Sequence, residues 1–268
     1  MTVTNDPAGL AGHRDHPARM GFFTDTSICI GCKACEVACK EWNKVPDDGL
    51  NFLGTSYDNT GALGANSWRH VAFIEQPRQA GIRWLMSSDV CKHCTSAACL
   101  DVCPTGALFR TEFGTVVVQD DVCNGCGYCV PACPFGVIDK RPDDGRVWKC
   151  TLCYDRLRGG LEPACAQACP TKSIQFGPLE ELQARARARV ERLHHDGESG
   201  AQLYGADGDD GVGGLGAFFL LLDQPEVYGL PPDPVVPTRD LGRTWRAAAA
   251  SAAAFAAAVG AAFLGARR

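Results

Sequence analysis

The sixteen cysteines constrain this sequence more than any other feature, because all of them fall into four quartets. Every quartet ends in C-x3-C, and three of the four continue directly with proline. The quartets are, in chain order, Cys29, Cys32, Cys35 and Cys39; Cys91, Cys94, Cys99 and Cys103; Cys123, Cys126, Cys129 and Cys133; and Cys150, Cys153, Cys165 and Cys169.

The run C-x2-C-x2-C-x3-C, present in the first and third quartets, is typical of cubane iron–sulfur clusters. Three thiolates of such a loop hold one cluster, while the fourth cysteine ligates a neighbouring cluster. Gly31, Gly125 and Gly127 provide the backbone freedom that a loop wrapped around a cluster needs. We therefore expect all sixteen cysteines to bind iron, as four [4Fe–4S] clusters.

Two other uses of cysteine compete with this interpretation. Eight disulfides are one, but closely spaced cysteines rarely suit disulfide geometry, and the sequence shows no secretory signal. A structural zinc scaffold is the other, although zinc sites usually join two separated C-x2-C pairs. The continuous four-cysteine runs favour clusters over both.

The spacing of the quartets bears on domain organisation. Only residues 104–122 separate the second and third quartets, whereas residues 40–90 separate the first and second. This favours an inner two-cluster unit, around which the first and fourth quartets pair. Pairing of the first quartet with the second, and of the third with the fourth, is the alternative.

Short strand-like segments follow the cysteine blocks, at 107–109, 115–118, 137–138 and 173–176, and short helices are expected at the C-x3-C ends. This alternation predicts an α+β protein with two ferredoxin-like dicluster domains, one nested in the other, and a single C-terminal transmembrane helix. The expected segments are a flexible arm at 1–20, an outer dicluster domain at 21–84 and 143–178, an inner dicluster domain at 85–142, a helix and extended surface connection at 179–242, and an anchor at 243–268.

The C-terminal anchor is predicted from residues 247–266, which contain no charge and are long enough to cross a bilayer. Thirteen of these twenty residues are alanine, which is nearly neutral towards lipid, so a soluble alanine-rich helix is the alternative. The absence of a polar face favours the membrane helix. Arginines flank both ends, so charge does not fix its orientation.

Other classes of function are not indicated. The net charge is −5 and no basic run occurs, which gives no reason to expect nucleic-acid binding. Neither a Walker loop nor a G-x-G-x-x-G motif after a strand is found. We expect no catalytic residues, and a chain that transfers electrons without transforming a substrate itself.

The sequence resembles a known family over nearly its whole length: the four-cluster iron–sulfur subunits of molybdopterin oxidoreductases, in particular the beta subunits of membrane-bound formate dehydrogenases. The cluster motifs 29–35, 123–129 and 149–153 indicate the wider class. Segments without cysteines are more specific. They are Tyr57-Asp58-Asn59 with Ser67-Trp68, Gly211-Val212-Gly213-Gly214, Asp223-Gln224-Pro225-Glu226, and Tyr228-Gly229-Leu230-Pro231.

The resemblance implies four ligand sets. These are Cys29, Cys32, Cys35 with Cys169; Cys39 with Cys150, Cys153 and Cys165; Cys91, Cys94, Cys99 with Cys133; and Cys103 with Cys123, Cys126 and Cys129. It also implies a hetero-oligomer in the inner membrane, with the cluster domains on the periplasmic face. A molybdopterin-containing alpha subunit would oxidise formate, and this chain would relay electrons to a haem b gamma subunit and quinone. The equivalent subunit of another molybdopterin reductase or of a hydrogenase is the alternative.

Overall fold

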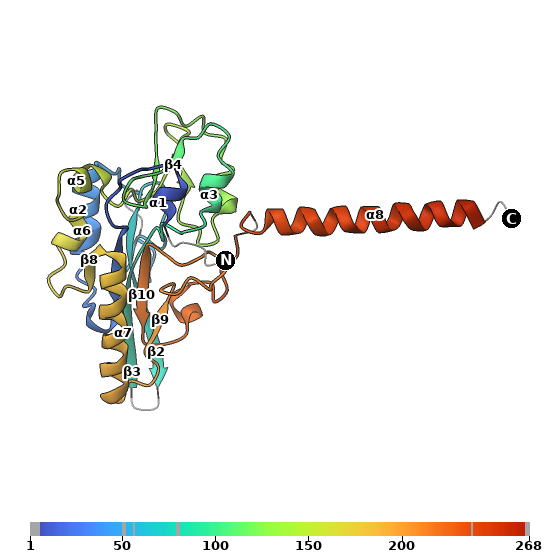
Figure 1. Ribbon diagram of the computed structural model, residues 1–268. Helices are drawn as coiled ribbons and strands as arrows, with labels where there is room; N and C mark the ends of the chain where they lie inside the picture. The colour runs from blue at the N-terminus through green and yellow to red at the C-terminus, as the bar shows by residue number, and fades with distance from the viewer. Residues whose placement is uncertain (1–5, 50–51, 56, 79–80, 237, 266–268) are drawn as a thin grey trace. The chain divides into compact units, whose positions relative to one another are not determined.

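The computed structural model describes residues 6–49, 52–55, 57–78, 81–236 and 238–265. These residues fall into two units, one ending at Val236 and the other comprising the residues after position 237. The first unit contains all sixteen cysteines and combines short helices with strands (Figure 1). The α+β class expected from the sequence is confirmed.

A four-stranded sheet with the order β8-β1-β10-β9 forms the base of the first unit. Its strands are β1 (Met20–Asp25), β8 (Ile174–Pro178), β9 (Gln202–Tyr204) and β10 (Ala217–Leu221). Strand β1 pairs in parallel with β10 and antiparallel with β8. Thus the two ends of the cysteine-bearing region, before the first quartet and after the fourth, lie side by side.

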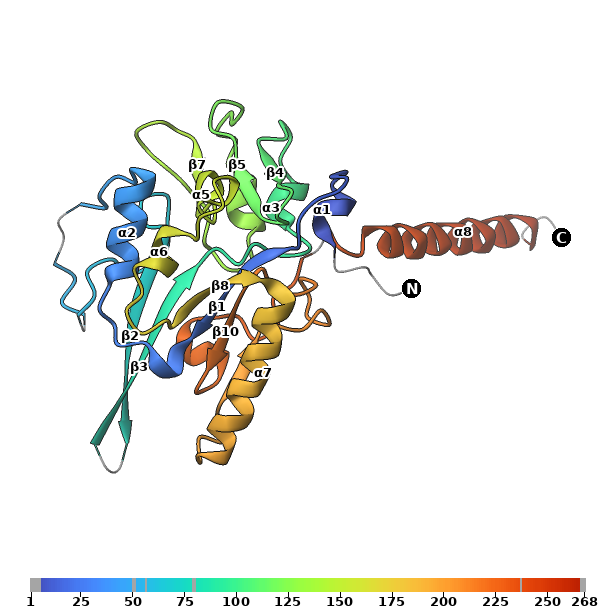
Figure 2. The same ribbon diagram turned by 60° about the vertical axis from the view of Figure 1, so that its left-hand side comes forward.

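The two faces of this sheet serve different purposes because side chains alternate along a strand. Phe23 stacks on Phe218 with ring centroids 5.3 Å apart, in the core that includes Leu182 of helix α7 (Leu179–His195). Phe22 and its partner Ala217 pack instead among the cysteines. Figures 1 and 2 both show α7 alongside the sheet. The helix expected within the segment 179–242 is thus α7, at the start of that segment.

The helices at the cysteines are short, as expected. They are α2 (Ala34–Asn43), α3 (Ala98–Asp101), α4 (Cys129–Ala132), α5 (Tyr154–Arg158) and α6 (Ala164–Gln167). Helix α2 packs against α6, and α3 against α4. These contacts join the first quartet to the fourth and the second to the third.

Hairpins connect these parts. The longest, β2 (Arg69–Arg78) with β3 (Gly81–Val90), was not expected, and the expected boundary between residues 84 and 85 lies inside β3. Smaller hairpins pair β4 (Leu108–Arg110) with β5 (Val116–Val118), and β6 (Asp139–Lys140) with β7 (Val147–Trp148). Two 3-10 turns complete the unit, η1 (Thr26–Ile28) and η2 (Pro225–Tyr228).

Two segments differ from the expectation of a flexible arm and an extended surface connection. The described part of the arm contains helix α1 (Pro7–Leu10), in which Ala8 is buried, and His13 Nε2 lies 2.8 Å from the Arg110 carbonyl oxygen. Within residues 196–242, β10 is buried along its whole length. Its continuous apolar run is the pattern of a strand covered on both faces.

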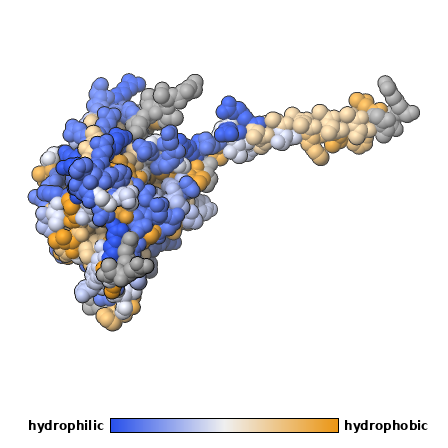
Figure 3. All heavy atoms as spheres, turned by 90° about the horizontal axis from the view of Figure 1, so that it is seen from below, coloured by the Kyte–Doolittle hydropathy of each residue, from blue (hydrophilic) through white to orange (hydrophobic). Residues whose placement is uncertain are grey.

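The second unit consists mainly of α8 (Leu241–Gly265), 25 residues long. At 1.5 Å per residue it measures about 37 Å, which exceeds the ~30 Å hydrocarbon core of a bilayer. Figure 3 shows hydrophobic residues along most of it and hydrophilic residues near its start. The structure therefore contains one C-terminal helix that is long and apolar enough to cross a membrane. Ala266, Arg267 and Arg268 lie outside the described residues.

Candidate functional site

The structure gathers the sixteen cysteines into four sets of four, each drawn from two quartets. Two sets line cavities, and the other two are recognised because their thiols lie close enough to perturb one another's ionisation. Set 1 is Cys29, Cys32, Cys35 and Cys169; set 2 is Cys39, Cys150, Cys153 and Cys165; set 3 is Cys91, Cys94, Cys99 and Cys133; set 4 is Cys103, Cys123, Cys126 and Cys129. These are the groupings that the resemblance implies.

Local backbone conformation turns each C-x2-C pair inward. The second residue between the paired cysteines has a positive φ in all four quartets: 65° at Gly31, 44° at His93, 71° at Gly125 and 57° at Leu152. Glycine adopts this conformation without cost, which explains two of the positions. Histidine and leucine adopt it only where the surroundings hold them. The sequence identified the glycines but gave no sign of the other two.

The four cysteines of set 3 line one cavity, and those of set 1 line another. Among the described residues, no three His, Cys, Asp or Glu side chains lie close enough to hold one metal ion. The arrangement of these sulfurs therefore does not suit mononuclear zinc, whereas a cluster of several irons takes its thiolates from around a shared space.

Backbone N–H groups point at several of these sulfurs. Leu152 N lies 3.2 Å from Cys150 Sγ. Burial alone would raise the pKa of Cys103, but hydrogen bonds from the N–H groups of Leu108 and Thr105 outweigh it and lower that pKa. Donors aimed at sulfur stabilise the thiolate form, which is the form that ligates iron.

Other thiols are held in the protonated form until a metal replaces the proton. Burial raises the pKa of Cys35 to about 11 and that of Cys99 to about 12, despite the nearby cations Arg69 and Lys149. At neutral pH these thiols keep their protons. Cluster insertion must therefore release protons, as is usual where metal binding is coupled to folding.

Contacts within the fold connect each set with the next one. Arg69 contacts Cys165 of set 2 and Ser88, whose hydroxyl contacts Cys35 of set 1. Cys91 and Cys133 of set 3 pack in one core with cysteines of sets 1 and 2, and cysteines of sets 3 and 4 pack together in another. These contacts order the sets in a row, with sets 2 and 3 in its middle.

The two exposed cysteines occur at opposite ends of this row. Cys32 belongs to set 1 and Cys126 to set 4. All four cysteines of set 2 are buried, and those of set 3 are buried or half-buried. The ends of the row are therefore open to the surface and its middle is covered.

Buried cations accompany the inner part of the row. Arg69, Lys92 and Lys149 are each no more than 2% exposed. Lys149 donates from Nζ to the carbonyl oxygens of Val116 and Cys150, and Lys92 pairs with Asp89. A buried charge requires such partners, and near thiolates it offsets their negative charge. The sequence placed Lys149 in the cluster motif 149–153 but gave no sign of Arg69 or Lys92 as part of the site.

A carboxylate anchors the loop of the first quartet. Asp58 accepts hydrogen bonds from Lys33 Nζ at 3.1 Å, from Thr60 N at 2.9 Å, and lies 2.7 Å from His70 Nε2. Burial would raise the pKa of Asp58, but the bonds from His70 and Thr60 outweigh it and lower the pKa to about 2. Lys33 lies between two cysteines of set 1, so Asp58 fixes that loop from outside.

Two families described as "4Fe-4S dicluster domain" match the sequence, one over residues 82–179 and the other over 28–107. The nitrate-inducible formate dehydrogenase iron–sulfur subunit of Escherichia coli K12 is 42% identical over 241 residues, which are 88% of this chain and 81% of the relative. The formate dehydrogenase iron–sulfur subunit of Haemophilus influenzae is 43% identical over 83% of this chain and 72% of its own length. A subunit of the anaerobic dimethyl sulfoxide reductase of E. coli K12 is 37% identical, over 62% of this chain and 76% of the relative. Similarity at this level over most of the chain and the cysteine geometry agree: this protein belongs to the family of formate dehydrogenase iron–sulfur subunits, which carry 4Fe-4S dicluster domains.

Proposed function

We propose that this chain is the electron-transfer subunit of a formate dehydrogenase complex and that each cysteine set holds one [4Fe–4S] cluster. The observation that carries the proposal is the row of four sets, with exposed cysteines at its two ends. A bound [4Fe–4S] cluster accepts and releases a single electron, with a potential set by its surroundings. The sixteen cysteines fix four such carriers in sequence.

Residues that surround the cysteine sets exclude water and place positive charge near the thiolates. Phe22 and Trp68 belong to the buried core that includes cysteines of sets 1, 2 and 3, and they shield these cysteines from water. Arg69 and Lys149 place positive charge beside thiolates of sets 1, 2 and 3. Because the relatives are iron–sulfur subunits of formate dehydrogenases, we assign formate oxidation to a molybdopterin-containing partner subunit.

The second partner and the location follow from α8. Its length and composition suit a single membrane span, in a hetero-oligomer with a haem b membrane subunit that passes the electrons to quinone. We place the cluster domains on the periplasmic face of the inner membrane. Protease added to spheroplasts should then cleave the cluster domains, whereas protection of these domains would reverse the orientation.

Metal analysis and EPR of the purified complex test the cluster assignment. Four clusters require about sixteen iron atoms per chain, and reduction should produce EPR signals from all four sets. About four zinc ions per chain, with no paramagnetic signal, would establish a zinc scaffold instead.

The similarity to a dimethyl sulfoxide reductase subunit supports a second candidate, the equivalent subunit of another molybdopterin reductase. The large subunit that copurifies with this chain distinguishes the two. Formate-dependent reduction of an artificial acceptor supports the first candidate, and its absence, with activity on a sulfoxide, supports the second.

A further inference from the structure

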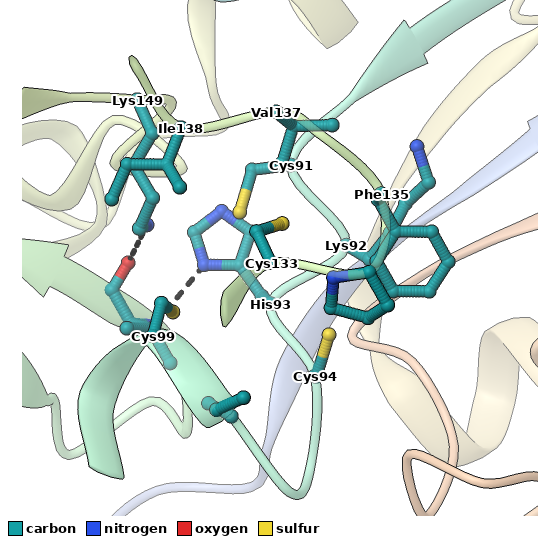
Figure 4. A pocket seen from close by; sticks show the side chains of 14 residues that line it. Cys91, Lys92, His93, Cys94, Cys99, Cys133, Phe135, Val137, Ile138 and Lys149 are labelled. Atoms are coloured by element: carbon teal, nitrogen blue, oxygen red, sulfur yellow. Dashed lines mark hydrogen bonds between the residues drawn. The ribbon is translucent and has the colours of Figure 1, made fainter. Parts of the chain in front are cut away.

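Among the described residues that line the set 3 cavity, only His93 has a buried side-chain nitrogen or oxygen atom without a hydrogen-bond partner. His93 is 1% exposed and lines this cavity with the four cysteines of the set. In Figure 4 its ring lies among Cys91, Cys99 and Cys133, and the dashed line to the ring marks a bond from Val116.

That bond fixes the tautomer. The backbone N–H of Val116 lies 3.1 Å from His93 Nδ1, and a backbone N–H can only donate. Nδ1 must therefore present its lone pair, which leaves the ring neutral and puts its proton on Nε2. Nε2 is a buried donor without a hydrogen-bond partner among the described residues.

The protein holds this donor in place at a cost. His93 has a φ of 44°, at the position occupied by Gly31 and Gly125 in the first and third quartets. A non-glycine residue in this region costs about 1–3 kcal/mol. Its carbonyl oxygen is fixed by Arg19 Nη2 at 3.3 Å and by Gly216 N at 3.3 Å. A merely structural loop residue would not need an oriented imidazole here.

We propose that His93 donates a hydrogen bond from Nε2–H to a sulfur of the cluster held by Cys91, Cys94, Cys99 and Cys133, and thereby raises the reduction potential of this cluster. The inference rests on the proposed function. Reduction adds negative charge to the cluster sulfurs, so a fixed donor stabilises the reduced form more than the oxidised form. A buried donor without a hydrogen-bond partner is unfavourable. The cluster sulfur would therefore also supply the partner that Nε2–H of His93 lacks.

Two substitutions separate this role from a structural one. His93→Asn provides an oxygen near the position of Nδ1 for the Val116 N–H and tolerates a positive φ, but it has no group that reaches as far as Nε2. His93→Gln restores an N–H donor at about the distance from the backbone that Nε2 of histidine reaches. The control is His194→Asn. His194 lies in α7, and its Nε2 is 2.7 Å from the carbonyl oxygen of Ala201.

The experiment is an EPR-monitored redox titration of the purified complex. His93→Asn should lower the potential of one cluster, the one that Cys94→Ser alters; His93→Gln should restore part of the loss, and His194→Asn should change none. If all clusters of His93→Asn are present and titrate as in the unmodified complex, the inference is wrong.

A second measurement needs no variant. Pulsed EPR of the unmodified, reduced complex containing [15N]histidine should detect a histidine nitrogen and an exchangeable proton coupled to one cluster. Absence of both couplings from every cluster overturns the inference. A complex that contains no [4Fe–4S] cluster overturns the proposed function instead, so the two failures are distinct.

Discussion

Nη2 of Arg69 lies 3.3 Å from Sγ of Cys165, and the whole arginine is 2% exposed. Its Nη1 donates to the Ser88 carbonyl oxygen at 3.1 Å, and Ser88 Oγ lies 3.3 Å from Cys35 Sγ. One buried cation therefore lies between set 1 and set 2. Burial would lower the pKa of Arg69, but the sulfurs of Cys165 and Cys35 outweigh it and raise the pKa, so the guanidinium stays charged.

Replacing Arg69 with glutamine should weaken both the fold and the electron affinity of two clusters. Loss of one partner of a buried charge pair costs about 3–5 kcal/mol, and the reduced clusters of sets 1 and 2 lose a counter-charge. Arg69→Lys keeps the charge but loses the planar guanidinium group. The cluster potentials of Arg69→Lys should therefore lie closer to those of the unmodified complex than the potentials of Arg69→Gln do. Redox titration and thermal unfolding measure the two effects. Unchanged potentials in Arg69→Gln would show that the cation acts on folding alone.

Asp58→Asn should destabilise the loop of the first quartet by about 1–3 kcal/mol, because Lys33 and His70 lose a charged acceptor. The pKa of Asp58 is lowered to about 2, so its contribution is complete above the unfolded value of ~3.9 and is lost only as the pH falls through 2. The difference in Tm between the two proteins should therefore not shrink between pH 8 and pH 5. A difference that closed within this range would exclude ionised Asp58 as the stabilising group.

Gly125 and Gly127 form a matched pair for testing the cluster loops. Both have a positive φ, of 71° and 77°. A Cβ atom at Gly125 would lie 2.3 Å from the Gly145 carbonyl oxygen, whereas at Gly127 it would meet no atom of the described residues within 4 Å. Both alanine variants strain the backbone, but only Gly125→Ala also forces two backbone segments apart. Gly125→Ala should thus lose more of the set 4 EPR signal and more stability, by about 1–3 kcal/mol. Equal losses in the two variants would contradict the close approach at Gly145.

The parts of the structure that the sequence predicted are those encoded by short local patterns. The C-x3-C helices, the helix at 179–195 and the apolar C-terminal helix each depend on residues within one or two turns of one another. The apolar run of β10 is equally local, but its Gly- and Asp-rich surroundings suggested a surface segment.

The groups that surround the cysteines could not be predicted in this way, because their roles depend on distant partners. Arg69 meets a sulfur 96 positions away, and His93 receives its hydrogen bond from a residue 23 positions away. The place of His93 between Cys91 and Cys94 allowed a hydrogen bond to a cluster as one interpretation, but nothing in the sequence identified Val116 as its partner, and a single arginine carries no information about such a neighbour. Only the fold brings them together.

The final prediction concerns the membrane helix, whose alanine content makes its insertion marginal. Phe255, Val259, Phe263 and Leu264 together contribute only about −1 to −2.5 kcal/mol of insertion free energy, while one arginine at the centre costs about 2.5 to 3.5 kcal/mol. Ala256→Arg should therefore abolish insertion, whereas Leu264→Arg, near the end of the helix, should cost less because the side chain reaches the interface.

The measurement is alkaline extraction of membranes that contain the full chain produced without partner subunits. The unmodified chain and Leu264→Arg should stay with the lipid, and Ala256→Arg should be extracted. A chain lacking residues 241–268 should also be soluble and keep its iron, because all sixteen cysteines lie in the other unit. If Ala256→Arg resisted extraction as well as the unmodified chain, α8 could not be the anchor, since a helix this weakly apolar cannot absorb a central charge.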